Sequence, residues 1–249
     1  MNFPFKNKLK EEQYIPWRFE YKYRLPVRQY YQLKNALTVH MQADSYTLKS
    51  PEGRYLVRSL YFDNDLFQAY YEKIEGNFGR IKCRIRTYGP YLEDDSVLRV
   101  ELKNRWGESI EKHSTFISAQ DYLSFMDNRH WPDRDNKVLQ EFERIYYLRA
   151  MKPKVLVEYY REGFLPRNHD DLRITMDHGV QSCFTDVLFP EPALFKKHFY
   201  HTVILEIKCR RHKPPWLSRL VRHHGLKYIA NSKYTQGLEA VRPDLISPY

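Results

Sequence analysis

The chain has 249 residues, 42% of them hydrophobic, and carries a formal net charge of +10. This length and hydrophobic content suit one β-rich domain with a substantial core, and the charge indicates an acidic partner: phosphate polymer, nucleotide, nucleic acid or anionic membrane. Three widely spaced cysteines, Cys83, Cys183 and Cys209, predict neither a disulfide framework nor a paired-cysteine zinc site, and they favour a reducing compartment. Residues 1–13 lack the apolar core of a signal peptide and no apolar run approaches the ~20 residues of a membrane span, so we expect a soluble, cytoplasmic chain.

The predicted elements begin after a loose lead-in at residues 1–16, and the spacing of apolar side chains assigns most of the rest. In chain order, we expect a strand at 17–25, a helix at 27–40, strands at 55–63, 79–88, 98–103 and 109–116, helices at 118–126 and 136–151, strands at 154–161, 172–177 and 203–209, and helices at 216–224 and 232–241. Pro26 ends the first strand and suits the first turn of the helix after it. Residues 66–75 fit a short helix and an extended strand equally. We expect the strands to pair antiparallel and in sequence order.

The strand at 79–88 carries a ladder of cations. Side chains of a strand alternate between its faces, so the cations at every second position from Arg80 to Arg86 share one face and the apolar residues share the other. Four other strands have charged faces, comprising Glu20, Lys22 and Arg24; Arg99, Glu101 and Lys103; Arg173, Thr175 and Asp177; and Glu206 and Lys208. A solvated edge strand could carry one such ladder, but five favour a barrel with charges inside and helices over its apolar outer face. Because unpaired buried cations are costly, a polyanionic ligand would supply the missing counter-charge.

Several common catalytic motifs are missing from the sequence. It has no glycine-rich phosphate loop, and its nine glycines leave few places where backbone amides could cradle phosphate. It has no Gly-x-Ser-x-Gly elbow either, which leaves a serine hydrolase unsupported. Cys209 and His212 lie close in sequence, as do His223 and His224, but neither pair has the second half of a zinc site. We interpret them as surface or structural residues.

Arginine, lysine and one well-placed carboxylate point to phosphate chemistry. Arginine binds phosphate through two parallel hydrogen bonds and lysine acts as a mobile point charge. A carboxylate supports a hard cation such as Mg²⁺ or Mn²⁺, which also keeps phosphate oxygens as ligands. Phosphoryl transfer needs little else, since its transition state spreads negative charge over oxygens.

Seven short motifs follow one another along the chain. They are Arg18-Phe19-Glu20-Tyr21-Lys22-Tyr23, Ser59-Leu60-Tyr61-Phe62-Asp63-Asn64, Arg84-Ile85-Arg86, Glu101-Leu102-Lys103, Tyr159-Tyr160-Arg161, Leu205-Glu206-Ile207-Lys208 and Ser232-Lys233-Tyr234. Together they resemble the polyphosphate polymerase (VTC) domain of the CYTH-like triphosphate tunnel metalloenzyme group, over roughly residues 17–241. The resemblance implies an α+β fold in which an antiparallel β-barrel forms a basic tunnel with helices packed outside, as a single domain over residues 17–249.

The resemblance also implies a reaction: transfer of the γ-phosphoryl group of ATP to the end of an inorganic polyphosphate chain or pyrophosphate primer, with Mn²⁺ or Mg²⁺. Catalytic positions would be Lys22, Arg84, Arg86, Lys103, Arg161, Arg173 and Lys233. Substrate-binding positions would be Lys73, Lys112, Tyr159, Ser232 and Lys208, and Glu206 would hold the metal. Eukaryotic members carry regulatory and membrane segments, so separate partners are expected here, including a membrane protein that would place the chain at the inner face of a membrane; no nucleic acid partner is expected.

Three positions depart from the family pattern. Arg18 replaces the first of two glutamates common in the wider tunnel group, which removes one metal carboxylate and fits the VTC branch better than the hydrolases. Lys73 stands where the polymerases can carry arginine, so a bidentate contact would be lost. Ala230 stands where a further lysine is expected, and Lys227 could replace it from one turn away. The last two departures bear on catalytic rate more than on fold.

Some assignments stay open at this point. Arg80 and Lys82 fit a solvated mouth as well as a functional one, and Lys208 fits phosphate contact as well as pairing with a neighbouring carboxylate such as Glu158. Asp177 is interpreted as structural. Two other functions remain as alternatives: a non-catalytic binding module for polyphosphate or inositol phosphate, and a triphosphate hydrolase of the same fold. A nucleic-acid binder is disfavoured because the cations face a lumen and no exposed aromatic stacking positions are evident.

Overall fold

Ten strands form one antiparallel sheet in the computed structural model, which describes residues 19–246 except 108, 168–170 and 211. The predicted lead-in at 1–16 and the departure at Arg18 lie outside the described residues. The main strands follow the spatial order β1 (Phe19–Pro26), β10 (Thr202–Cys209), β8 (Leu172–Phe184), β7 (Lys152–Pro166), β3 (Tyr55–Asp63), β4 (Gly79–Thr87), β5 (Leu98–Trp106) and β6 (Ser109–Ile117). Two short strands flank this path, β2 (Met41–Ala43) beside β7 and β9 (Lys196–Lys197) beside β8. The predicted antiparallel pairing is confirmed.

Strand pairing in sequence order is wrong at two places. β1 pairs with β10 and β3 pairs with β7, so strands far apart in the chain become neighbours. β7 and β8 also run several residues beyond their predicted ends, because each has partners on both edges that continue the ladder. A register shift in β7 near Glu158 lets this long strand bend.

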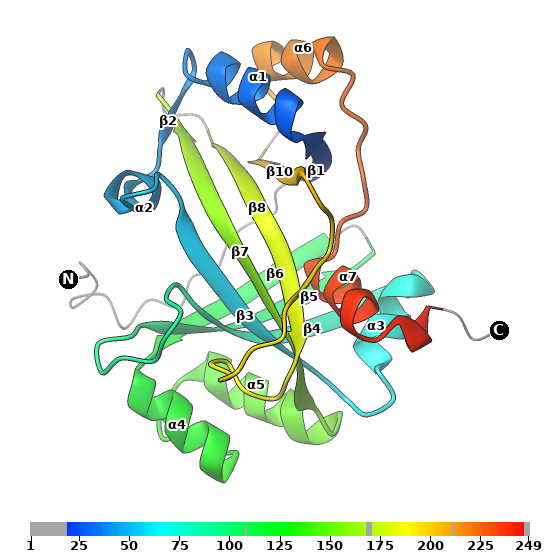
Figure 1. Cartoon of the computed structure of the whole chain (residues 1–249). Helices are drawn as coiled ribbons and strands as arrows, with labels where there is room; N and C mark the ends of the chain where they lie inside the picture. The colour runs from blue at the N-terminus through cyan, green and yellow to red at the C-terminus, as the bar shows by residue number, and fades with distance from the viewer. Residues whose placement is uncertain (1–18, 108, 168–170, 211, 247–249) are drawn as a thin grey trace.

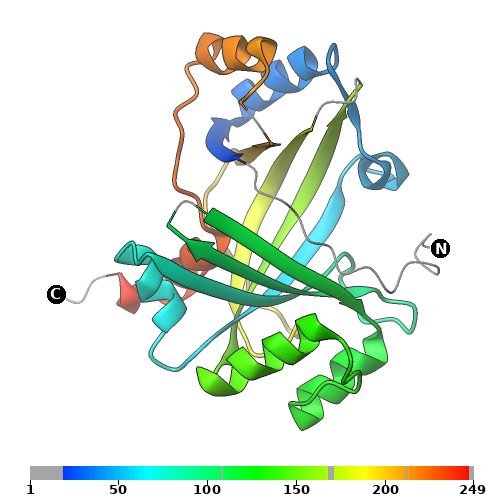
Figure 2. The same cartoon turned by 180° about the vertical axis from the view of Figure 1, so that it is seen from behind.

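Most helices lie outside or at the ends of the bent sheet, and α7 (Lys233–Val241) lies on its concave side. The others are α1 (Val27–Leu37), α2 (Ser45–Lys49), α3 (Gln68–Ile74), α4 (Ala119–Asn128), α5 (Lys137–Leu148) and α6 (Pro215–His223), and a short 3₁₀ helix at Pro243–Leu245 follows α7. Figure 1 shows α1 and α6 at one end of the sheet and α4 and α5 at the other, and Figure 2 shows the same arrangement from behind. None of the described helices is long and apolar enough to cross a membrane.

Local sequence explains where several helices begin. Ser118 and Asp121 form the predicted capping box of α4. The ambiguous segment at 66–75 contains the helix α3, because the Asp63 carboxylate accepts hydrogen bonds from the amides of Ala69 (3.0 Å) and Tyr70 (3.2 Å). A carboxylate at the first-turn amides satisfies donors that have no partner inside the helix.

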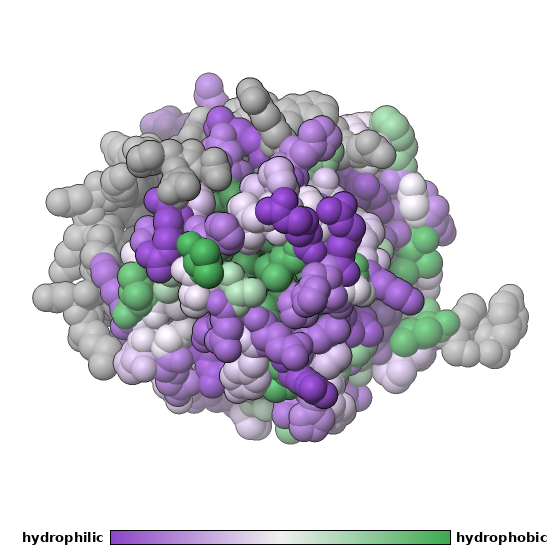
Figure 3. All heavy atoms as spheres, turned by 90° about the horizontal axis from the view of Figure 1, so that it is seen from above, coloured by the Kyte–Doolittle hydropathy of each residue, from purple (hydrophilic) through white to green (hydrophobic). Residues whose placement is uncertain are grey.

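Apolar side chains on the outer face of the sheet pack under helices, as predicted. Ile85 and Leu102, both fully buried, share a cluster with Phe125 of α4 and Phe142 of α5. A second cluster joins the buried face of β10 to α1 and α6 and includes Ile207, Leu33 and Leu217. Figure 3 views the molecule from the end of α1 and α6, where the atoms not drawn in grey are mostly hydrophilic. The apolar stripes of these helices are therefore buried in the core.

The predicted closed barrel is wrong: the sheet is open, with β1 and β6 at its two ends. The physical reason lies at the edge of β1 that faces away from β10. Tyr228 forms an antiparallel bridge with Tyr23 there, and the amide of Ile229 donates to the carbonyl of Lys22 at 2.9 Å. The segment at 228–229 thus takes backbone groups that a barrel would use for the next strand.

Side chains and α7 complete the walls that backbone pairing leaves open. Lys103 of β5 reaches Glu20 of β1 across the open side, with 3.0 Å between Nζ and Oε2. On the concave side, Tyr234 and Leu238 of α7 pack with Val57 and Val157 of the sheet. The result is a cavity with a mixed wall of sheet, coil and helix.

Candidate functional site

The concave face of the sheet surrounds a cavity of about 680 Å³. Among the described residues, thirteen lysine and arginine side chains line it against three carboxylates, an excess of ten positive charges. The carboxylates are Glu20, Glu101 and Glu206. The positive charge of the chain is therefore concentrated at one internal surface.

Twelve of the thirteen predicted site residues line this cavity. They are Lys22, Lys73, Arg84, Arg86, Lys103, Lys112, Tyr159, Arg161, Glu206, Lys208, Ser232 and Lys233. They come from strands β1, β4, β5, β6, β7 and β10 and from α3 and α7 with the cap that precedes it. The four cations of β4, from Arg80 to Arg86, all face inward, as the alternation predicts.

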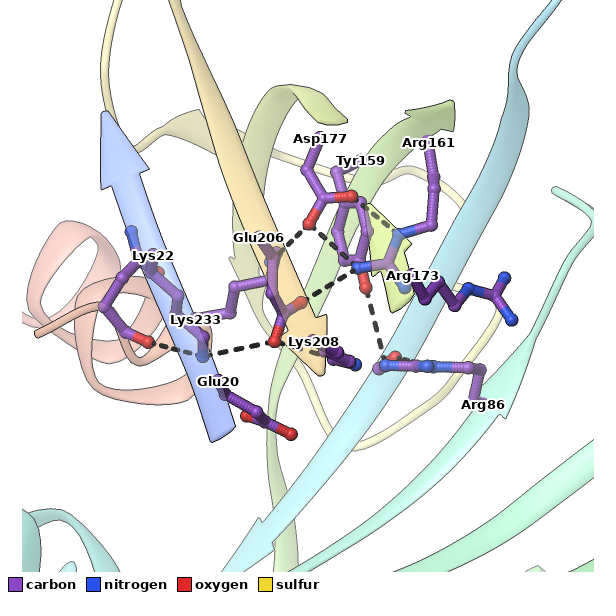
Figure 4. A network of polar contacts seen from close by, with 12 residues as sticks. Glu20, Lys22, Arg86, Tyr159, Arg161, Arg173, Asp177, Glu206, Lys208 and Lys233 are labelled. Atoms are coloured by element: carbon purple, nitrogen blue, oxygen red, sulfur yellow. Dashed lines mark hydrogen bonds and ion pairs between the residues drawn. The ribbon is translucent and has the colours of Figure 1, made fainter. Parts of the chain in front are cut away.

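Arg173 is the exception. Its guanidinium contacts the Asp44 carboxylate at 2.9 Å, and it does not belong to the cavity lining. Figure 4 shows its side chain directed away from Glu206. Asp44 caps α2, an element that the sequence reading missed, so a carboxylate supplied by an unforeseen helix draws Arg173 outward.

Other assignments are settled by their partners. Glu158 lies on the outer side of the sheet and pairs with Arg58 at 2.7 Å. Lys208 lies 3.6 Å from Glu206, so it does pair with a neighbouring carboxylate, but that carboxylate is Glu206 and not Glu158. Ala230 lines the cavity, but Lys227 is exposed and lies outside the lining, so it does not replace the missing lysine.

Glu101 is the hub of one cation cluster. Its carboxylate, 1% exposed, accepts hydrogen bonds from Arg84 and Lys112, and Arg86 and Arg99 lie 3.9 and 3.8 Å away. Burial alone would raise the pKa of Glu101, but Arg84, Arg86 and the other cations outweigh it and hold that pKa well below its usual range. Glu101 therefore stays ionised and fixes the guanidinium groups in place.

Asp177 holds a second cluster. Its carboxylate contacts Arg161 at 2.6 Å and Lys233 at 2.5 Å, and the side chain is fully buried. Burial opposes ionisation, but Arg161 and Lys233 lower the pKa of Asp177 to about 2. Lys233 and Arg161 also lie over the ring of Tyr159, whose hydroxyl accepts from Arg86 at 3.4 Å. This contact links the two clusters.

Glu206 faces the cations from the β1 side (Figure 4). Its oxygens lie 3.6 Å from Lys208 and 3.8 Å from both Lys22 and Arg161. Burial would raise the pKa of Glu206, but Lys208, Lys22 and other cations hold it well below the usual value. The cations therefore keep the carboxylate ionised. These three separations exceed those of direct hydrogen bonds, so none of these cations holds the carboxylate in a close pair.

Glu20 is the second carboxylate on this wall. It lies two residues before Lys22 on the same face of β1, and Lys22 pairs in register with Glu206. Burial works against its ionisation, but Lys208 and Lys103 lower the pKa of Glu20 to about 2. Among the described residues, no group of three or more His, Cys, Asp or Glu side chains is arranged to hold a metal. Since Mg²⁺ is commonly bound by one or two carboxylates plus substrate phosphates, Glu20 and Glu206 fit a metal that arrives with triphosphate.

Sequence reasoning missed two cations of the cavity, and it placed two carboxylates on charged faces without giving them a role at the site. The cations are Arg105 and Lys213; the carboxylates are Glu20, which contacts Lys103, and Glu101, which organises one cation cluster. Arg105 could have been found, because β5 continues to Trp106 and the alternation that includes Lys103 extends one step further. Lys213 lies in a loop, where alternation gives no signal.

Comparisons with known proteins agree with this picture. A sequence model of the VTC domain family matches residues 17–242. A putative adenylate cyclase from Bacillus halodurans, 12% identical, superposes with a TM-score of 0.55 over 86% of this chain and 92% of its own, which shows a shared fold. A putative adenylate cyclase from Vibrio parahaemolyticus, also 12% identical, gives 0.48 over 88% and 97% of the two chains. No curated protein is similar enough in sequence to match. Since the family model spans nearly all of the described fold and its cavity, the chain belongs to the VTC domain family.

Proposed function

We propose that this protein is an ATP-dependent polyphosphate polymerase, which transfers the γ-phosphoryl group of ATP to the terminal oxygen of a polyphosphate chain. The observation that carries the proposal is the cavity lined by ten more cations than carboxylates, with the ionised Glu206 among them. A triphosphate and a phosphate chain match that charge. The chain's family, and the similar fold of a putative adenylate cyclase, support the same proposal.

The positioned cations would do most of the work. Arg84 and Arg86, held by Glu101, would bind phosphate oxygens with planar donor pairs, and Arg161 and Lys233, held by Asp177, would do so from the opposite wall. Because these groups are fixed before substrate enters, they stabilise the charge of the transferring phosphoryl group with little reorganisation. The attacking group is a phosphate oxygen, so no covalent enzyme intermediate is needed.

Glu206, with Glu20 beside it, would hold Mg²⁺ or Mn²⁺ together with the triphosphate. The metal would act there as a Lewis acid on phosphate oxygens. Glu20 also holds Lys103 at 3.0 Å, but the nearest cation contacts of Glu206 are 3.6 Å or longer. Without a metal, Glu206 would oppose the incoming polyanion, so a protein that only binds polyphosphate has less use for it. This favours the enzyme over the binding module.

The test is Glu206→Gln, assayed with ATP and Mn²⁺ or Mg²⁺ and with products resolved on a gel. We expect polymer synthesis to collapse while preformed polyphosphate still binds, because binding depends mainly on arginine and lysine. Glu158→Gln is the matched control, since Glu158 is 7% exposed and Glu206 6%, but Glu158 pairs with Arg58 on the outer side. It should keep synthesis even if it melts earlier.

Three other results of these assays would contradict the proposed function or the role of Glu206. Synthesis near the wild-type rate in Glu206→Gln would make Glu206 structural. Phosphate release without chain growth in the wild-type protein would favour the hydrolase, and no turnover with either metal would favour the binding module.

A further inference from the structure

The cations of the cavity divide into two groups by their partners. Most lie within 4 Å of a carboxylate: Glu101, Asp177, Glu206 or Glu20. Five others line the same cavity with no carboxylate within that distance among the described residues: Lys73, Arg80, Lys82, Arg105 and Lys213. Lys213 lies apart, over the rings of Tyr21 and Tyr23 of β1, whereas Lys73, Arg80, Lys82 and Arg105 lie on α3, β4 and β5. We call these four the unpaired quartet. The positive charge is therefore uncompensated at one part of the cavity wall.

The strand register brings members of the quartet against like charges. Arg80 of β4 stands directly opposite Arg105 of β5, and Lys82 stands opposite Lys103. Like charges directly opposite each other destabilise a sheet. Lys73 projects from α3, next to β4. These like charges, gathered at one surface, create a positive field that attracts anions.

The quartet's neutral contacts leave hydrogen-bond donors to spare. Lys82 donates to the Ser232 hydroxyl at 2.8 Å, and Arg105 donates to the carbonyl of Gly107 at 2.7 Å. The Nε of Arg80 is buried without a hydrogen-bond partner. An unpartnered buried guanidinium nitrogen is rare and calls for a ligand that accepts hydrogen bonds.

Nearby carboxylates do not neutralise the quartet, because they are engaged elsewhere. Glu72 pairs with Arg149 at 2.9 Å, and Glu239 accepts a hydrogen bond from the Tyr70 hydroxyl at 3.4 Å. Burial, followed by repulsion from neighbouring cations, lowers the pKa of Lys73, Arg80 and Lys82. An anion at this surface would relieve that repulsion.

We infer that Lys73, Arg80, Lys82 and Arg105 form a second anion subsite, which binds metal-free phosphates of the acceptor polyphosphate chain. The inference rests on the proposed function and deepens it. The wall with Glu20 and Glu206 suits a triphosphate that carries a divalent cation, since carboxylates and phosphates share the metal. The quartet has no carboxylate in reach, so it suits phosphates that carry no metal. The phosphoryl donor, ATP, and the acceptor chain would thus bind at different parts of the cavity, because only the donor carries a divalent cation.

The experiment compares the affinities of tripolyphosphate and of a longer polyphosphate of defined length, in the presence of Mg²⁺, for the full-length wild-type protein and for Arg80→Gln/Arg105→Gln. We expect the wild-type protein to bind the longer chain more tightly. The double variant should lose roughly tenfold or more for the longer chain, the scale of one or two charged hydrogen bonds, and stay within about twofold for tripolyphosphate. Arg219→Gln/Arg222→Gln, which removes two exposed cations from α6, is the matched control and should leave both affinities unchanged.

Thermal melting provides an independent check on folding. The substitutions relieve repulsion but remove the hydrogen bond from Arg105 to the carbonyl of Gly107. Any decrease in the melting temperature of the double variant should therefore be no larger than the loss of that one hydrogen bond explains. Equal weakening of both ligands in the double variant, or equal weakening by the control variant, would overturn the inference while leaving the proposed function in place. If wild-type protein binds the longer chain no more tightly than tripolyphosphate, the inference also fails. If it binds neither, the proposed function fails with it.

Discussion

The buried Asp177 provides a sharp test of how the cavity is held together. Asp177→Asn removes the charge that faces Arg161 and Lys233 but keeps the size of the side chain. The pKa of Asp177 lies at about 2, against the ordinary 3.8. At 1.36 kcal/mol per pKa unit, its ionised form stabilises the fold by about 2 kcal/mol over a neutral one. Since removing one partner of a buried ion pair costs about 3–5 kcal/mol, we expect a loss of about 2–4 kcal/mol.

Urea unfolding at neutral pH measures this loss. Asp65→Asn is the matched control: Asp65 also contacts two lysines, Lys152 and Lys154, but it is 62% exposed, so solvent screens the pairs and no measurable loss is expected. Tripolyphosphate should restore more stability to Asp177→Asn than to the wild-type protein, because the ligand replaces the missing negative charge. A change in unfolding free energy of less than about 1 kcal/mol would refute the view that Asp177 holds the cations in place.

The ion pairs of Asp177 with Arg161 and Lys233 also determine how the stability of the fold depends on pH. The pKa of Asp177 is lower in the folded than in the unfolded chain, so its contribution is fully present above the unfolded value near 3.8 and is lost as pH falls towards 2. Asp177→Asn should therefore flatten the stability profile in that window. An unchanged acid limb would contradict the assignment.

Three further predictions follow from the site and its scaffold. Tripolyphosphate should raise the melting temperature of the wild-type protein more than chloride at equal ionic strength does, since it binds the native cavity; equal shifts would indicate general screening. Arg84→Ala should weaken both polyphosphate binding and turnover, unlike Glu206→Gln, and binding at wild-type strength would remove Arg84 from the site. Ser118→Ala should reduce unfolding free energy by about 1 kcal/mol through loss of the α4 capping box, without changing polyphosphate affinity.

Alternation and capping determined much of the architecture from sequence. The cations from Arg80 to Arg86 recur at every second position, and a strand can place such residues on only one face, so their gathering needed no knowledge of partners. Likewise, Ser118 and Asp121 predict a helix start because both groups of the capping box lie within one turn. The inward direction followed from five strands that repeat the division, since their apolar faces must be covered.

Only the tertiary structure decided how the strands join and which charges compensate each other. The segment at 228–229 reaches the edge of β1 from about 200 residues along the chain, and no local pattern announces that it will take the place of a strand and leave the barrel open. Arg173 has the alternation of an inward cation, but it turns to Asp44, whose position depends on α2. Glu101 reads as one charge among several, and only the folded sheet surrounds it with four cations. Pairing of charges depends on distances across the cavity, which residue spacing along one strand does not contain.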